Sequence, residues 1–233
     1  MAGAGRRGWL RAGAVAILLS LALPAMAVAQ GVVDQQLWLQ VLATFRLSEQ
    51  WRLHLEEWPR FSDDADGATQ VITRAALGRR LSPAAGAWGG YAWIAKPPGP
   101  GVNHEHRLWQ QLSMTLPTAA RWTSSMRVRL EQRFQESWSD ASHRLRVMGR
   151  GVRPFDAERQ WALTTWDELL LTLDETTVGP WQGVDQNRLF AGVLRQFSPR
   201  VGLEMGYLWV TSDPPATPRA HAHTLSVWLN LTP

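Results

Sequence analysis

Polar and apolar residues alternate along much of the chain after position 30, with the period of two that a β-strand produces. The clearest case is the segment 121–134. Apolar side chains dominate one parity of this segment: Trp122, Met126, Val128, Leu130 and Phe134. The other parity holds only polar and charged residues: Arg121, Thr123, Ser125, Arg127, Arg129, Glu131 and Arg133. A helix would mix the two sets on one stripe, so a strand with one apolar and one polar face is predicted.

Similar alternation predicts ten further strands. They lie at residues 35–46, 50–58, 69–81, 86–95, 104–116, 141–152, 160–173, 185–197, 201–211 and 224–231. The leucines of segment 160–173 would also suit a buried helix. Single-chain barrels of bacteria usually have an even number of strands, so the expected count is left at 10–12.

Tight and long connections alternate between these segments. The tight ones fall at 47–49, 82–84, 117–119 and 198–200, and the long ones, at 62–68, 96–103, 174–184 and 212–220, are rich in Pro, Gly and Asp. Short turns on one side and long loops on the other are typical of outer-membrane barrels. The pattern predicts an all-β fold, an antiparallel up-and-down transmembrane β-barrel of 10–12 strands. A soluble β-sandwich with a tryptophan core is the weaker alternative, because charged residues recur in the middle of the strands.

The N-terminus has the three parts of a secretory signal peptide. Arg6, Arg7 and Arg11 are followed by an apolar run at 12–23 and by an A-x-A site, Ala27-Val28-Ala29. We therefore expect a signal peptide at 1–29 and a single barrel domain at 30–233. The expected location is the bacterial outer membrane, reached through the periplasm. The expected partners are outer-membrane lipid and the barrel-insertion machinery, and the oligomeric state is left open.

Composition narrows the classes of function. The chain has no cysteine, which excludes disulfides and cysteine-based zinc sites, and no cofactor is expected. Loss of the three signal-peptide arginines from a net charge of +4 leaves a nearly neutral chain, so nucleic-acid binding is not expected. The chain has 14 Trp but 2 Tyr. Five tryptophans are placed at strand ends, where amphipathic rings would lie at the membrane interfaces: Trp51, Trp58, Trp122, Trp161 and Trp209.

Charged residues on the polar parity are the candidate lumen residues. They are Arg74, Arg127, Arg129, Glu131, Arg133, Arg146, Arg188 and Glu204. Ion pairing inside the barrel is the favoured interpretation, and a lumen that favours anionic solutes is the alternative. Barrels of about 8 strands are filled by side chains and those of 16–18 leave an aqueous channel, so 10–12 strands would leave a narrow path at most.

Two further patterns are candidate chemical sites. Ser142 and His143 are the one adjacent Ser–His pair, but neighbours on a strand point to opposite faces, and no G-x-S-x-G motif is present. A barrel enzyme acting on envelope lipids therefore remains an alternative only. Two H-x-H pairs are weak candidates for metal binding: His104, His106, His221 and His223. Their parity matches that of neighbouring leucines, which favours a place at the membrane interface.

Several short motifs carry a resemblance to a known family. They are Leu37-Trp38, then Leu47-Ser48-Glu49-Gln50-Trp51 up to Glu56, residues 127–133, Asp185-Gln186-Asn187-Arg188 with Gly192, and Glu204-Met205-Gly206-Tyr207. In order and spacing the chain resembles the family called domain of unknown function 2490, a family of bacterial outer-membrane barrels. The resemblance implies location and fold and brings no catalytic residues. The expected function is structural or that of a narrow pore, with a barrel enzyme or a soluble periplasmic binding protein as alternatives.

Overall fold

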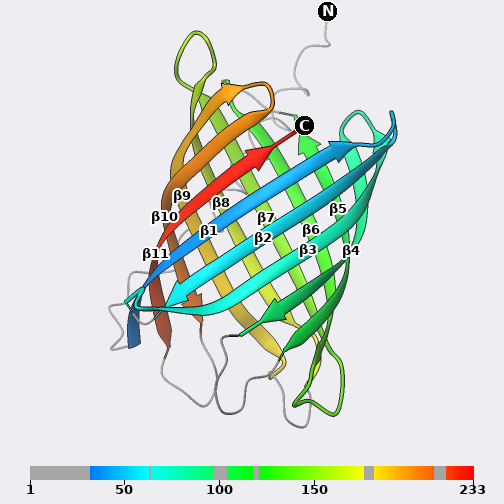
Figure 1. Cartoon of the computed structure of the whole chain (residues 1–233), viewed down its shortest axis with the longest axis vertical. Coiled ribbons are helices and arrows are strands. Elements are labelled where there is room, and N and C mark those ends of the chain that lie inside the picture. Colours follow the sequence, from blue (N-terminus) through cyan, green and yellow to red (C-terminus); the bar gives the residue numbers. More distant parts are fainter. Residues whose placement is uncertain (1–31, 63, 97–103, 118–120, 176–180, 213–218) are drawn as a thin grey trace, which may run out of the picture. The chain divides into compact units, whose positions relative to one another are not determined.

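A computed structural model describes residues 32–62, 64–96, 104–117, 121–175, 181–212 and 219–233. Eleven β-strands form in this part of the chain and close into a barrel in which strand order follows the sequence (Figure 1). The strands are β1 (Val32–Arg46), β2 (Trp51–Ser62), β3 (Gly67–Ser82), β4 (Ala85–Ala95), β5 (Glu105–Leu116), β6 (Thr123–Gln135), β7 (Ser142–Pro154), β8 (Trp161–Thr172), β9 (Gly183–Ser198), β10 (Val201–Ser212) and β11 (Ala220–Leu231).

The predicted all-β barrel is confirmed, and the closed sheet excludes the sandwich alternative. Each predicted strand corresponds to one of the eleven observed strands. The segment that also suited a helix is strand β8, in which every second side chain from Ala162 to Thr172 is buried. In the described residues no helix is long and apolar enough to cross a membrane.

One seam of the barrel differs from the antiparallel expectation. β1 pairs with β11 in parallel, from Val32 opposite Ala220 to Ala43 opposite Leu231. The other neighbouring strands pair antiparallel. An odd number of alternating strands leaves the first and last pointing the same way, so closure requires one parallel pair. The predicted antiparallel barrel is therefore observed with this one parallel seam as its exception.

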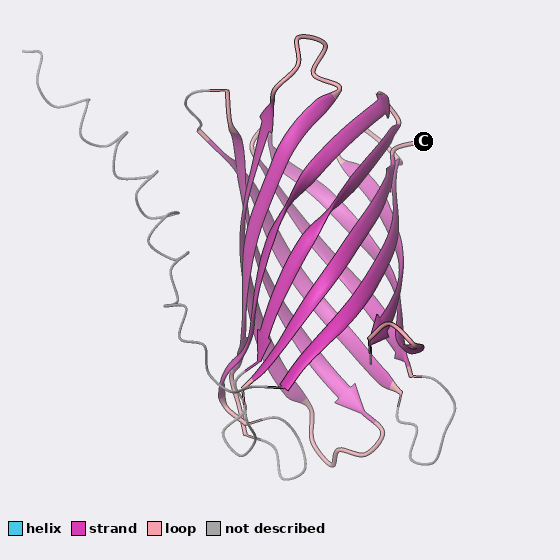
Figure 2. Cartoon of the chain, turned by 90° about the vertical axis from the view of Figure 1, so that its left-hand side faces the viewer, coloured by secondary structure: helices cyan, strands magenta, loops and turns pink. Residues whose placement is uncertain are grey.

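The two ends of the barrel differ in their connections (Figures 1 and 2). The C-terminus lies at the end where β1 joins β2, β3 joins β4 and β9 joins β10, which we call the turn end. A serine closes each of these turns, because its hydroxyl accepts a backbone N–H two residues on. The donors are Gln50 for Ser48, Ala84 for Ser82 and Arg200 for Ser198.

The opposite end, where β1 begins, is called the loop end. The long predicted connection between β8 and β9 lies there, together with the ends of β4 and β10 (Figure 1). The connection between β2 and β3 is shorter than predicted, because β2 continues to Ser62 and β3 begins at Gly67. The predicted signal peptide at 1–29 and the Pro/Gly-rich segment 97–101 lie outside the described residues.

The two faces of the wall have opposite character. On the inward parity, charged side chains such as Glu131 and Glu204 are buried. On the outward parity, large apolar side chains such as Leu55, Leu108 and Met205 are exposed. The core of this fold therefore lies inside the barrel and contains many ions, which is the reverse of a water-soluble domain.

Candidate functional site inside the barrel

Glu131 on β6 is the centre of the ion pairs inside the barrel, with 1% of its surface exposed. Its Oε1 lies 2.8 Å from Arg146 Nη1, and its Oε2 lies 2.7 Å from Arg144 Nη2. Arg107, from the strand on the other side, lies 3.8 Å from the same carboxylate. Arg129, on the same strand, lies 3.7 Å away. Four arginines therefore surround one buried carboxylate.

A second carboxylate extends these pairs across the interior. Glu168 on β8 lies 2.7 Å from Arg146, 2.6 Å from Arg127 and 3.4 Å from Arg188. Arg127 is on β6, and β6 and β8 are separated by β7, so this pair can form only through the inside of the barrel. Arg146 bridges Glu131 and Glu168 and joins the two clusters.

Three further glutamates complete what we call the charged network. Glu56 pairs with Arg74, and Glu204 on β10 pairs with Arg150 on β7. Glu105 binds two arginines, Arg107 at 2.7 Å and Arg133 at 2.6 Å. All eight candidate lumen residues make contacts in this network. It also contains residues that sequence reasoning did not single out: Glu56, Glu105, Arg107, Arg144, Arg150 and Glu168. All six lie on the inward parity of their strands, so the alternation in the sequence could have identified them.

An aromatic group lies beside the charged network. Its members come from five strands and touch inside the barrel: Trp38, Trp58, Trp166, Phe190 and Trp228. Ring centres lie 5.3 Å apart for Trp38 and Trp58, 6.5 Å for Trp58 and Trp228, and 5.3 Å for Trp228 and Trp166. Trp166 stacks on Phe190 at 5.1 Å. Because Arg188 lies 5.3 Å from the Trp38 ring and also pairs with Glu168, the aromatic group and the network are in contact.

The tryptophan prediction needs a correction. Trp58 is 5% exposed and points inward, because it shares the parity of Glu56 and Arg60. Trp51 and Trp161 are exposed at the turn end, whereas Trp122 and Trp209 are half-buried. β2 continues past Trp58 to Ser62, so Trp58 lies neither at a strand end nor on the outward face.

Glycines make room for the inward rings. Gly192 on β9 lies opposite Gly206 on β10, and a side chain at Gly192 would come within 2.6 Å of Phe190. Gly90 is similar, since an added Cβ would lie 2.6 Å from the Trp109 ring. Because these glycines have no side chain, the rings can pack against the backbone, and the barrel can enclose several of them.

The four histidines of the H-x-H pairs form aromatic contacts on the outward parity. His106 hydrogen-bonds the Tyr91 hydroxyl, and His223 does the same with Tyr207. His104 and His221 contact Trp93 and Trp209 at ring distances of 5.5 and 5.8 Å. The same arrangement thus occurs twice: a Tyr and a Trp on β4 or β10 contact the two histidines beside them, before or within β5 and in β11. Within the described residues, no three potential ligands are placed to hold a metal ion.

Ser142 and His143 meet through a third residue. Asp174 accepts hydrogen bonds from Ser142 Oγ at 3.3 Å and from the His143 backbone N–H at 2.8 Å. His143 Nδ1 lies 2.5 Å from the other carboxylate oxygen. Partial burial works against ionisation, but these bonds outweigh it and hold the pKa of the Asp174 carboxyl below its ordinary value. Since the hydroxyl bonds the carboxylate and not the imidazole, this geometry has no nucleophile–base pair.

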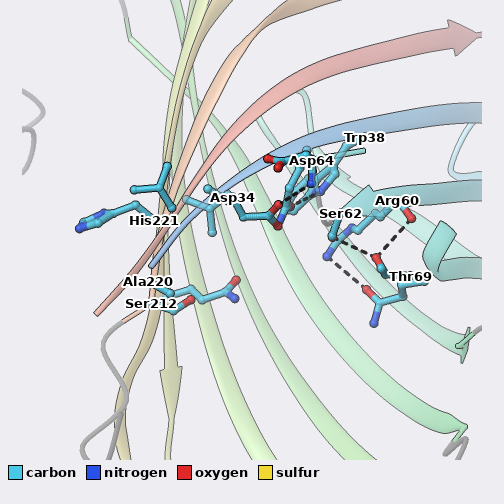
Figure 3. Close-up of a pocket in the computed structure, with 15 residues that line it drawn as sticks. Asp34, Trp38, Arg60, Ser62, Asp64, Thr69, Ser212, Ala220 and His221 are labelled. Carbon is cyan, nitrogen blue, oxygen red and sulfur yellow. Dashed lines mark hydrogen bonds between the residues drawn. The ribbon is translucent and has the colours of Figure 1, made fainter. Parts of the chain in front are cut away.

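A cavity of about 730 Å³ lies at the loop end (Figure 3). It is lined mainly by β1, β2 and β3 on one side and by the ends of β9, β10 and β11 on the other. Trp38 of the aromatic group and Arg60 are among its lining residues. A smaller cavity of about 280 Å³ lies at the turn end, lined by Arg52, Arg80 and Ser113 among others. The two cavities share no lining residue.

Comparison with known proteins finds a matching family but no known activity. A family model described as "protein of unknown function (DUF2490)" matches residues 35–221. An uncharacterised protein of Methylorubrum extorquens is 29% identical over 217 residues, which cover 91% of this chain and 94% of the relative. No solved structure matches the chain. With most of its length matched by the family model, the chain belongs to the DUF2490 family of proteins of unknown function.

Proposed function

We propose that the protein is an outer-membrane β-barrel whose interior is closed at mid-depth, with a structural role for the charged network. The observation that carries this proposal is the reversed polarity of the wall. Large apolar side chains such as Val41, Leu77 and Leu163 are exposed, while Glu131 and Arg146 are buried. Lipid would contact the outward side chains, and barrel-insertion machinery would deliver the chain to the membrane.

Polar groups on the outward parity are compatible with lipid because they bond in pairs. Thr73 donates to Glu57 at 2.7 Å, and Asn187 donates to Asp167 at 2.7 Å. The amides of Gln110 and Gln132 bond each other at 3.1 and 3.2 Å. Paired groups of this kind avoid most of the cost of an unsatisfied polar group in hydrocarbon.

The closed interior is supported by contacts that cross it. Arg127 reaches from β6 to Glu168 on β8, Arg150 reaches from β7 to Glu204 on β10, and Trp228 touches Trp166 three strands away. These side chains occupy the space between the two end cavities. A narrow pore would require these side chains to move apart.

Spin labels on adjacent residues test the location. The chain lacks cysteine, so Leu112→Cys and Ser113→Cys each give a single labelling site. Leu112 is 38% exposed on the outward parity, and Ser113 lines the turn-end cavity. In reconstituted protein we expect the label at 112 to be more accessible to oxygen and the label at 113 more accessible to a water-soluble relaxant. The reverse order would contradict the membrane assignment.

Planar-bilayer recording tests the closed interior separately. We expect the wild-type protein to insert without a steady ionic conductance. Steady conductance would contradict the closed interior and favour the narrow pore, and an anion preference would follow from the excess of arginine in the charged network.

A further inference from the structure

Arg60 on β2 differs from the arginines of the charged network. Its Cζ lies 3.8 Å from the Trp38 ring centre and 3.9 Å from the Trp58 ring centre. Its Nη1 donates to Gln70 Oε1 at 3.3 Å, and no carboxylate of the described residues forms an ion pair with it. The guanidinium is thus held against two indoles. Arg60 and one of these tryptophans, Trp38, line the loop-end cavity (Figure 3).

This environment leaves the charge of Arg60 unneutralised. Indole faces attract a cation but carry no net negative charge. Nε is buried without a hydrogen-bond partner, and Nη2 donates to no protein atom that the structure describes. A half-buried cation loses hydration and gains most from an anionic acceptor, because charge-assisted hydrogen bonds are the strong ones.

The cavity beside Arg60 has one polar wall and an opposite wall on which small apolar side chains accompany Gln186 and Ser212. Ser62 and Thr69 lie on the same side as Arg60, and Ala220 lies on the opposite side (Figure 3). Val210 and Ala222, from β10 and β11, are the other apolar residues on the side of Ala220. A volume of about 730 Å³ is within the range of about 300–1,000 Å³ of small-molecule sites.

Asp34 limits the charge of an acceptable ligand. Its two carboxylate oxygens accept Gln36 Nε2 at 2.6 Å and the Asp64 backbone N–H at 3.1 Å. The carboxylate lines the same cavity as Arg60 without pairing with it. It would repel a dianion more strongly than a monoanion.

We propose that the loop-end cavity binds a small organic monocarboxylate. Its carboxylate group pairs with Arg60, and its apolar body lies against Val210, Ala220 and Ala222. Gln70 and Ser62 line the cavity on the same side as Arg60 and can donate further hydrogen bonds to the carboxylate of the ligand. The site goes beyond the proposed structural role and does not depend on the location of the barrel.

Benzoate is the probe, and benzamide is its neutral analogue of the same shape. We expect calorimetric titration of the folded full-length protein, in a nonionic detergent, to detect benzoate and not benzamide. Arg60→Gln should weaken benzoate binding at least ~10-fold, since a buried charged partner is lost. Asp34→Asn should strengthen it. Arg52→Gln, which changes an arginine of the turn-end cavity, is the matched control and should leave it unchanged.

Three results would overturn the proposal. They are equal benzoate binding by wild type and Arg60→Gln, binding of benzamide as tight as that of benzoate, and tighter binding of inorganic phosphate than of benzoate. Heat-modifiable migration reports whether each variant is folded. Should Arg60→Gln fail to fold, Ala220→Trp fills the cavity from the opposite wall with Arg60 in place. This variant should abolish benzoate binding, and undiminished binding would also overturn the proposal.

Discussion

Arg146 and Arg60 show two ways in which this barrel holds an arginine on its inward face. Arg146 has Glu131 on one side and Glu168 on the other, at 2.8 and 2.7 Å, and is 3% exposed. Arg60 has two indoles, one amide and a cavity. The first arginine has its charge neutralised by protein groups, and the second does not.

The difference separates stability from binding. An ion pair at Arg146 joins β6, β7 and β8 through the interior, so its loss should loosen the wall. Arg60 joins no carboxylate, so its loss should leave no unpaired acid behind. We therefore expect substitutions in the charged network to change mainly the free energy of unfolding, and substitutions at Arg60 to change mainly ligand binding.

The largest effect is expected at Glu131. Glu131→Gln leaves four buried arginines around an uncharged amide, and removal of one partner from a buried pair costs about 3–5 kcal/mol. Urea unfolding in lipid vesicles would measure the loss. Glu158→Gln, at an exposed position between β7 and β8, is the control and should change stability by less than about 0.5 kcal/mol. A loss at Glu131 as small as that of the control would mean that the network is not structural.

An arginine placed on the outer face extends the comparison. Val128 lies on the outward parity of β6, next to the inward Arg129. Val128→Arg should cost about 2–4 kcal/mol in a bilayer, because no water or carboxylate is there to receive the charge. Ser125→Arg lies on the inward parity of the same strand and lines the turn-end cavity, so it should cost less. Equal losses in vesicle unfolding experiments would contradict the assignment of the two faces.

A smaller change in stability is expected at Arg60. Arg60→Gln removes cation–π contacts worth about 1–2 kcal/mol, but also removes a cation that lacks a counter-ion. The two terms oppose each other, so the unfolding free energy should change by less than about 1 kcal/mol. Urea unfolding in lipid vesicles would measure this change in free energy. A loss as large as that of Glu131→Gln would remove the distinction between the two arginines.

Much of the fold could be predicted because strand periodicity is local. The alternation in 121–134 is enough to predict a strand, and each parity has the burial that its residues suggest: Arg129 and Glu131 are buried, and Phe134 is exposed. The parallel pairing of β1 with β11 was beyond this reasoning. It joins residues about 190 positions apart and depends on closure of the whole sheet, although the odd strand count was a hint.

The interior could be predicted in kind but not in detail. Parity selects the inward arginines, but the partner of each depends on the stagger between strands, which the sequence does not encode locally. Arg127 reaches past β7 to Glu168, and Arg60 meets Trp38 and Trp58 at the loop-end cavity. Parity alone could have placed Trp58 inside, since it stands two residues from both Glu56 and Arg60.

The smallest effect is expected at the loop end, where Asp174, just after β8, is hydrogen-bonded to His143 at the start of β7. Because His143 holds the pKa of Asp174 below its ordinary value, the carboxylate stabilises the fold at neutral pH. That contribution is present above the unfolded pKa of about 4 and is lost as the pH falls through the lower folded value. For a partly exposed pair it should be about 0.2–1 kcal/mol, far below that of Glu131. Asp174→Asn should therefore lower the urea midpoint slightly at pH 7, and the difference from wild type should shrink as the pH falls below about 4. A difference that stayed constant with pH would show that the side chain acts through hydrogen bonds that the amide cannot make, and not through its charge.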